Sequence, residues 1–337
     1  MGTMSPYPAQ TRYIARACAK LGYRFTDLDK GGGYLFAVSD GRDEFISGAA
    51  GICAFPINGA SAFGVSKDKY HTNTVLARAG LKVIPGALFF LSPEYAKLRE
   101  PGREIADAIA HFARMPKPVF CKPNLGARGN FAEVVTDEAA FRDYLERVAT
   151  RFDMVLLQPV IDGGEHRIFC LDDEAVFATR KADFSLEGDG RATLAQLIRA
   201  HNAELKGTGI SAVDEKAALA ALAARHKLGP DHVAAKGEKV ILPGRRNLSA
   251  GSDVADFTTD VPRALAEVAL KAVKAIGLRV AGVDLFDVSP ARDLSDLVII
   301  EVNGNPGMQS LEAIGRDDLI DDIWTTILKR AFAEMHP

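Results

Sequence analysis

The stretch IIEVNGNPGM places a carboxylate and an amide where they could bind a cation together. Glu301 and Asn303 are two residues apart, and residues i and i+2 of a strand point to the same face. The upstream stretch RVAGVDLFDV predicts a second strand that carries Asp284. Two acids and an amide, with no His or Cys, suit Mg2+ holding phosphates and do not suit zinc. The alternative is a strand end whose polar residues cap a turn.

A second group of residues could bind phosphates. Lys69 lies at the start of a predicted helix, and Lys122 closes the apolar strand PVFCK, where its ammonium must reach water or an anion. Gly126 and Gly129 in the next loop let backbone N–H groups turn toward a phosphate. A surface lysine and an ordinary hairpin are the alternatives for each feature alone. The order of strand, lysine, glycine loop and strand is more specific.

The stretch from Gln158 to Ile161 lies at the end of the predicted strand MVLLQPV and could form a hinge between subdomains. The carbonyl of Pro159 could accept a hydrogen bond from an adenine amino group, and Glu165 could accept from ribose hydroxyls. Arg167 is two residues further on and shares a strand face with Glu165. The alternative is a polar strand edge with a surface Glu–Arg pair.

Two more cationic clusters suggest an acidic small-molecule substrate. Arg180 and Lys181 follow the apolar strand EAVFAT, and Arg245, Arg246 and Asn247 lie in a polar loop. Such cations either gather phosphate and carboxylate oxygens or face solvent. For the loop cluster, a solvated surface is the alternative.

The elements that position these residues alternate between helices and strands. TRYIARACAKLG predicts an amphipathic helix ended by Gly22, and a second helix is expected from an N-cap at Ser66 to Gly80. Thr136 is expected to cap a third helix, and a final helix is expected near 317–335. Several strands follow one another in hairpin succession. This pattern indicates α+β subdomains and not a doubly wound sheet.

Composition narrows the function classes. The chain has 337 residues, of which 47% are hydrophobic and 25% charged, enough for two or three subdomains. A net charge of −3 argues against a protein that binds nucleic acid by neutralising phosphates. No apolar run approaches the roughly 20 residues of a membrane span, and no signal-peptide pattern is present. The four cysteines lack a CxxC pair, which indicates reduced thiols and a cytoplasmic protein.

Together, these motifs resemble the ATP-grasp ligases from about Lys67 to about Leu311. The segment AGVDLF…LVIIEVNGNPGMQSLE is similar to the metal site of RimK-type ligases. RKADFSLEGDGRATLAQLI and RRNLSAGSDVADFTTDV are similar to cyanophycin synthetase and to the ATP-grasp part of bifunctional glutathione synthetase. SKDKY and GGEHR match the spacing in D-alanine–D-alanine ligase.

The resemblance implies an ATP-grasp fold, in which two α+β subdomains grip ATP. It implies a short N-terminal α/β pre-grasp unit (1–65), a small lid subdomain with its linker (66–160), and a C-terminal metal and substrate subdomain (161–337). A helical insertion is expected near 192–235. Gln158 departs from the pattern, because these families often have Glu at its position.

The resemblance also implies roles for individual residues. The nucleotide is expected to contact Lys69, Lys122, Gly126, Gly129, Gln158, Pro159, Ile161 and Glu165. The expected metal ligands are Asp284, Glu301 and Asn303, for two Mg2+ ions that Mn2+ can replace. The expected catalytic residues are Lys181, which reaches the terminal phosphate, and Arg167 and Arg245, which orient the acid substrate.

The expected activity is ATP-dependent amide formation between a carboxylate, such as an amino acid or peptide, and an amine. It runs through an acyl phosphate and needs charge neutralisation and alignment more than a protein nucleophile. Two alternatives stay open: a phosphotransferase that acts on a non-carboxylate acceptor, and a silent nucleotide-binding partner subunit. The expected partners are small molecules, with no nucleic acid and no membrane, and a homodimer is an open alternative. The sequence does not identify the acid or the amine.

Overall fold

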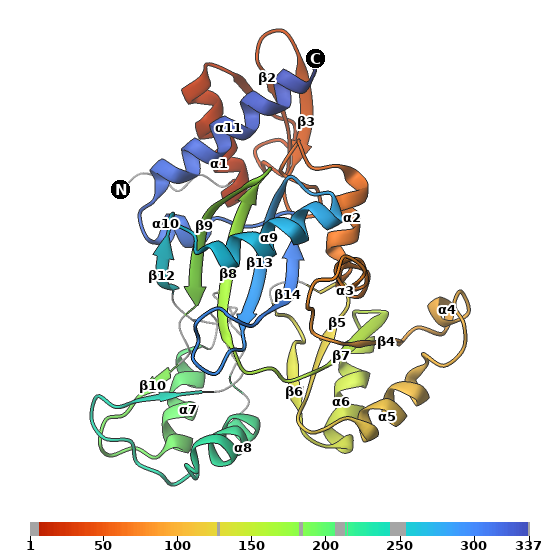
Figure 1. Ribbon diagram of the computed structural model, residues 1–337, viewed down its shortest axis with the longest axis vertical. Helices are drawn as coiled ribbons and strands as arrows, with labels where there is room; N and C mark the ends of the chain where they lie inside the picture. The colour runs from red at the N-terminus through yellow and green to blue at the C-terminus, as the bar shows by residue number, and fades with distance from the viewer. Residues whose placement is uncertain are drawn as a thin grey trace.

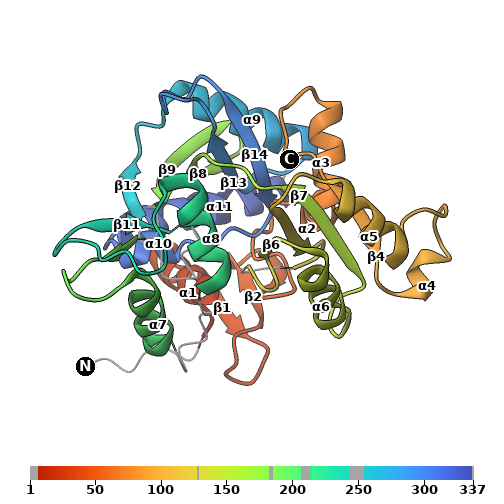
Figure 2. The same cartoon turned by 90° about the horizontal axis from the view of Figure 1, so that it is seen from below.

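The computed structural model describes residues 7–126, 129–181, 185–205, 213, 215–242 and 254–335. Within these residues the strands form four sheets, which Figure 1 shows from one side and Figure 2 from below. The largest sheet is central. A three-stranded sheet lies above it in Figure 1, and a smaller sheet and a helical lobe lie below it on opposite sides. These antiparallel sheets and separate helices confirm the predicted α+β class.

The central sheet has five antiparallel strands in the order β12, β9, β8, β13 and β14. Their bounds are Val254–Thr258 (β12), Glu174–Lys181 (β9), Gly164–Leu171 (β8), Val280–Asp287 (β13) and Leu297–Asn303 (β14). The pairing of β8 with β13 is unbroken, from Leu171 opposite Val280 to Gly164 opposite Asp287. Because β13 is paired on both sides from Gly282 to Asp287, the sheet fixes the positions of these residues.

Helix α9 (Arg263–Ile276) covers one face of the central sheet. Its buried residues recur at helical spacing, and Gly277 ends the helix in the left-handed region at φ 83°. They share one core with sheet residues such as Val283 and Leu285. Helices α2 (Ala60–Lys67) and α3 (Lys69–Arg78) add Ala62 and Leu76 to this core.

Helices α11 (Asp317–Met335) and α1 (Ala9–Leu21) pack against the opposite face. Trp324 of α11 is fully buried and stacks on Phe55, with ring centroids 4.8 Å apart. The short helix α10 (Gln309–Ala313) precedes α11. The three-stranded sheet joins the same core, and its strands are β1 (Arg24–Asp27), β2 (Leu35–Ser39) and β3 (Glu44–Gly48). The N-terminal unit and the last helix therefore share one hydrophobic core.

The smaller sheet has four antiparallel strands in the order β4, β7, β5 and β6. Their bounds are Ala87–Phe90 (β4), Met154–Pro159 (β7), Val119–Pro123 (β5) and Glu133–Val135 (β6). Helices α5 (Ile105–Arg114) and α6 (Glu138–Ala149) pack against this sheet, and α4 (Pro93–Ala96) lies on the connection before α5. Phe112 stacks on Phe141 at 4.2 Å in a core of its own.

Two short connections join the small sheet to the central sheet. Before β4, the chain runs along the edge of β14, where Val83 forms a parallel bridge with Ile299. After β7, only residues 160–163 separate the small sheet from β8. Gln158 ties the two connections together, because its Nε2 donates to the carbonyl of Ile84 at 3.1 Å.

The helical lobe lies between β9 and β12 in the chain. Strands β10 (Ser185–Glu187) and β11 (Lys239–Ile241) pair, and α7 (Leu194–Glu204) and α8 (Glu215–His226) pack against one another beside them. Their buried residues form a fourth core. The domain boundaries inferred from the resemblance stay predictions.

Two expected helix caps are wrong. The helix expected from Ser66 is broken at Asp68, which has extended backbone, and the Asp68 carboxylate caps α3 by accepting from the N–H of His71 at 2.9 Å. Asp137, and not Thr136, caps α6 by accepting from the N–H of Ala140. In both cases a carboxylate one or two residues further on meets the helix N–H groups, where it also favours the helix dipole.

Among the described helices, none is long and apolar enough to cross a bilayer.

Candidate active site

The face of the central sheet that α11 contacts has two halves with different chemistry. At one end, Phe169 and Phe177 belong to the apolar core under α11. At the other end the same face carries charged and polar side chains, because residues two apart on a strand share a face. These are Glu165 and Arg167 on β8, Lys181 on β9, Asp284 on β13, and Glu301 and Asn303 on β14. The register sets Asp284 between Arg167 and Glu301, so these predicted residues lie together.

Arg167 and Asp284 form a two-point ion pair. Arg167 Nε and Nη2 donate to the two carboxylate oxygens of Asp284, each at 2.6 Å, and Asp284 is only 3% exposed. Burial alone would raise the pKa of Asp284, but Arg167 and then Lys181 outweigh it and hold that pKa below its usual range. Asp284 is therefore a carboxylate. Sequence reasoning gave these residues separate roles and missed their contact.

Glu165 and Lys181 form a second buried ion pair beside the first. Burial raises the pKa of Glu165, and the charge of Lys181 opposes this rise. Thr179 lies opposite Arg167 and is also buried, and within the described part of the chain its hydroxyl has no hydrogen-bond partner. Thr179 was not among the site residues predicted from the sequence. Its place two residues before Lys181 was the available signal.

Glu301 and Asn303 lie side by side at the end of β14, with Asn303 Nδ2 donating to Glu301 Oε1 at 3.0 Å. Across the described residues, no group of three or more His, Cys, Asp or Glu side chains is arranged to hold a metal ion. Mg2+ is usually bound by one or two carboxylates together with substrate phosphates. The oxygen-only donors Asp284, Glu301 and Asn303 suit this cation.

Two lysines from outside the central sheet lie near Glu301. Lys69 is the first residue of α3, Lys122 lies on β5 of the small sheet, and both interact electrostatically with Glu301. Lys122 is only 6% exposed, and burial lowers its pKa to about 8, a shift that Glu301 partly opposes. Burial also lowers the pKa of Lys69. An arriving anion would favour the charged form of both lysines.

The glycine loop after β5 is attached to α3. Lys69 Nζ donates to the carbonyl of Gly126 and, at 3.4 Å, to that of Asn124. Asn124 is fully buried, and its Oδ1 accepts from the N–H of Tyr70 at 2.9 Å. Among the described atoms, its Nδ2 has no partner. Asn124 is a second site residue that sequence reasoning did not single out, although it lies two positions after Lys122.

The expected adenine contacts lie at the connection between the two sheets. Pro159 ends β7, and Ile161 lies in the connection to β8. Gln158 is 1% exposed, and within the described residues its Oε1 has no partner. Gly129 follows the β5 loop at φ 70°, in the left-handed region that favours glycine. Arg245 lies outside the described residues.

Comparisons with known proteins identify similar sequences and a similar fold. Residues 231–327 match the family model described as RimK-like ATP-grasp domain. Cyanophycin synthetase of Geminocystis herdmanii is 27% identical over 281 residues, which cover 80% of this chain and 30% of that protein. The glutathione biosynthesis bifunctional protein GshAB of Mannheimia succiniciproducens is 33% identical over 254 residues, covering 72% of this chain and 32% of that protein. The chain thus spans about a third of the length of these curated relatives.

The crystal structure of a bifunctional glutathione synthetase from Pasteurella multocida superposes with a TM-score of 0.51 at 22% sequence identity. The match covers 96% of this chain and 44% of that chain. At this level of identity the likeness concerns the fold, and it extends over nearly every element described above. The chain therefore has the ATP-grasp fold, and its residues 231–327 are similar to the RimK-like ATP-grasp domain.

Proposed function

We propose that this chain is an ATP-dependent ligase that joins a carboxylate substrate to an amine and releases ADP and phosphate. One observation carries the proposal. The half-buried Lys69 and the buried Lys122 both interact with Glu301, on a sheet face that also holds Arg167 and Lys181. Such a concentration of cations around a few oxygen donors suits phosphoryl transfer, which depends on charge neutralisation and alignment. The fold and the names of the curated relatives support the same activity.

The chemistry needs no nucleophile from the protein. A carboxylate oxygen of the substrate attacks the γ-phosphorus of ATP, and the bond to the β–γ bridging oxygen breaks, which gives an acyl phosphate and ADP. The amine then attacks the acyl carbon, phosphate leaves, and the amine loses a proton as the amide forms. Within this scheme the protein binds, orients and neutralises charge.

The lysines are proposed to bind the nucleotide phosphates. Burial disfavours the ammonium of Lys122, so a phosphate placed beside it restores the interaction that water no longer supplies. Lys69 acts similarly and connects to the loop of Gly126 and Gly129, which is proposed to close over the phosphates. Lys181 is proposed to reach the terminal phosphate, which requires it to exchange its contact with Glu165 for a phosphate oxygen.

The remaining nucleotide contacts are proposed at the connection between the sheets. Gln158, Pro159 and Ile161 would contact adenine, and Glu165, once free of Lys181, would accept from ribose hydroxyls.

Glu301, Asn303 and Asp284 are proposed to hold Mg2+, in two ions that Mn2+ can replace. When bound, Mg2+ supplies positive charge beside the phosphate oxygens during transfer. Arg167 holds Asp284 in place through both carboxylate oxygens, and its planar guanidinium is also suited to a substrate carboxylate or an acyl phosphate. Arg245 is proposed to share this second role, and the acid is proposed to be an amino acid or a peptide.

The test is a screen for ADP release over amino acids and dipeptides, with mass spectrometry of the products. The proposal expects ADP and an amide in equal amounts with the right pair of substrates. A phosphorylated hydroxyl and no amide with any pair would instead establish a phosphotransferase. Failure of the chain to bind ATP at all would contradict both activities.

A further inference from the structure

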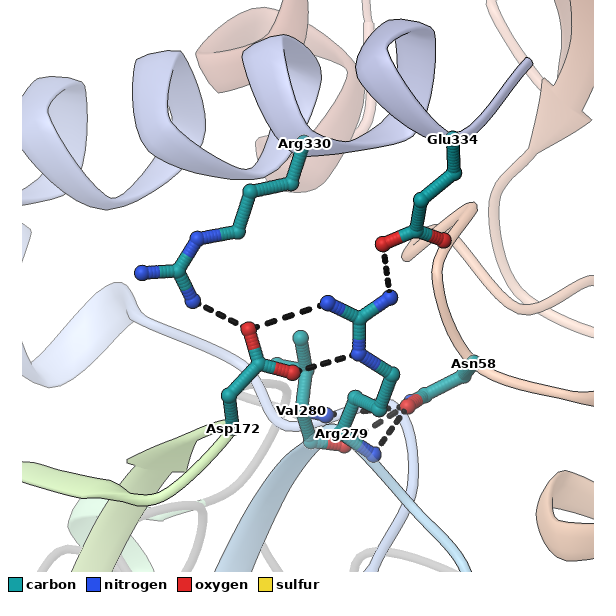
Figure 3. Close-up of polar contacts among 6 residues, drawn as sticks. All are labelled: Asn58, Asp172, Arg279, Val280, Arg330 and Glu334. Atoms are coloured by element: carbon teal, nitrogen blue, oxygen red, sulfur yellow. Dashed lines mark hydrogen bonds and ion pairs between the residues drawn. The ribbon is translucent and has the colours of Figure 1, made fainter. Parts of the chain in front are cut away.

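Asn58 occupies the point where the pairing of β13 and β14 ends. Its Oδ1 accepts from the N–H groups of Arg279 at 2.8 Å and Val280 at 2.9 Å, as Figure 3 shows. Its Nδ2 donates to the carbonyls of Val280 at 2.8 Å and Gly304 at 2.9 Å. The last pair of this ladder joins Gly282 to Asn303, so Asn58 continues the contact between the strands beyond it.

These bonds use the hydrogen-bonding capacity of the Asn58 side chain. An amide offers two acceptor sites and two donor hydrogens, and here each meets a backbone group. The orientation of the amide is fixed, because turning it over would face oxygen to carbonyl oxygen. Aspartate at this position would keep both acceptors, lose both donors, and place a negative charge against two carbonyls.

Asn58 acts on the residue directly after Asn303. The carbonyl of Gly304 accepts from Asn58 and also from the Cys53 thiol at 3.5 Å. On its other side, a Cβ at Gly304 would lie 2.5 Å from Ser66 Oγ. The backbone that leaves Asn303 is therefore held from two sides.

The backbone of Arg279, which Asn58 contacts through its Oδ1, is also held in place. The carbonyl of Arg279 accepts from the N–H of Asp172 at 2.6 Å, and its guanidinium binds the Asp172 carboxylate and Glu334. Arg330 of α11 binds the same carboxylate, which completes the network in Figure 3. Asn58 thus connects Gly304 to a backbone segment that three charged side chains hold in place.

We propose that Asn58 is a positioning residue that fixes where β14 ends, and with it the position of Asn303, for binding of the metal–nucleotide complex. This inference rests on the proposed metal site at the end of β14. Asn58 is not one of the residues proposed to contact the metal or the nucleotide. It acts through Gly304, by fixing the direction in which the strand ends. Outer contacts that orient metal ligands typically change metal affinity by about 10- to 100-fold when they are removed.

The experiment compares Asn58→Asp with Arg330→Ala in the full chain. Arg330→Ala is the matched control, because it weakens the same network without touching Gly304. Isothermal titration measures ADP binding with Mg2+ and with EDTA, and a thermal melt measures stability. The wild-type protein should bind ADP more tightly with Mg2+. Asn58→Asp should reduce this Mg2+-dependent gain by about tenfold or more and leave binding in EDTA unchanged. Arg330→Ala should lower the melting temperature and keep the gain.

Every other outcome shows whether the proposed metal site or the positioning role of Asn58 is wrong. If the wild-type protein shows no Mg2+-dependent gain, the proposed metal site fails and the role of Asn58 fails with it. If the gain is present and Asn58→Asp keeps it, or lowers binding equally with and without Mg2+, only the positioning role fails. If Asn58→Asp does not fold, Asn58→Ser is measured in the same way, since a hydroxyl is too short to reach both strands. If Asn58→Ser does not fold either, Asn58 is a structural residue and the inference is overturned.

Discussion

Arg167 donates to both carboxylate oxygens of Asp284, so the guanidinium and the acid on neighbouring strands form one unit. The pair lies between Glu165 and Lys181 on one side and Glu301 on the other. Its members cannot be changed independently, because each is the main charge partner of the other. This ion pair therefore fixes two neighbouring side chains in the charged half of the sheet face.

Arg167→Met should destabilise the fold strongly, because it leaves the Asp284 carboxylate buried without its main partner. Losing one member of a buried pair costs about 3–5 kcal/mol of unfolding free energy, which urea denaturation can measure. The double variant Arg167→Met, Asp284→Leu should recover most of this loss and stay inactive. If the double variant is as unstable as the single one, the pair is not the source of the effect.

Glu301→Gln should lower turnover by orders of magnitude with little change in the melting temperature. The substitution keeps the shape of the side chain and removes a charge that the proposed Mg2+ and both lysines meet. Steady-state kinetics at saturating ATP over a range of Mg2+ concentrations measures the effect. Asp296→Asn on the same hairpin, an exposed partner of Lys82, is the control and should behave like the wild type. Wild-type rates in Glu301→Gln at modest Mg2+ would refute the metal assignment.

Lys122→Met should weaken ATP binding and leave the melting temperature unchanged or higher. Methionine has a similar length and removes a charge that burial disfavours. Binding is measured by titration with ATP and stability by thermal melting. Lys82→Met, which changes an exposed lysine, should leave ATP binding intact. A large loss of stability with normal ATP binding in the remaining folded protein would show that Lys122 is structural.

The pKa of Lys122 predicts a pH dependence in two separate measurements. Its pKa is about 8 in the folded chain, so kcat/KM for ATP should fall as pH rises through 8, where the lysine loses its charge. An unfolded lysine titrates near pH 10.4, so between about pH 8 and 10.4 the unfolded chain binds more protons. The contribution of Lys122 to stability should therefore rise with pH over that window. Both effects should disappear in Lys122→Met, and an unchanged kinetic profile there would assign the titration to another group.

The strongly periodic elements could be predicted from the sequence. The final helix runs from Asp317 to Met335, as expected, and the α+β class follows from hairpin succession. The helix caps were harder to predict, because Asp68 and Asp137 lie close to the expected caps Ser66 and Thr136. Each aspartate, rather than its neighbour, accepts a hydrogen bond from a helix N–H group.

The residues of the candidate site could be proposed from the sequence, but the contacts between them could not. Glu301 and Asn303 are adjacent because of strand spacing, which the sequence contains. The pairing of Arg167 with Asp284 depends on the register between β8 and β13, which are more than 100 residues apart in the chain. Asn58 was missed for the same reason, since its bonds to Arg279, Val280 and Gly304 are to backbone groups far away in the chain.

Two chain connections attach the small sheet to the rest of the molecule, and Gln158 joins them at Ile84. The contacts of α3 with the glycine loop after β5 also join the two parts. A body held at two neighbouring points has essentially one rotational degree of freedom, about the line through those points. If the contacts between α3 and the glycine loop are released, movement of the small sheet should be directed toward and away from β14, with twisting and sliding opposed. Lys122 travels with that sheet, whereas Glu301 does not. Opening and closing should thus change the distance between these two charges more than any sideways displacement of the lysine.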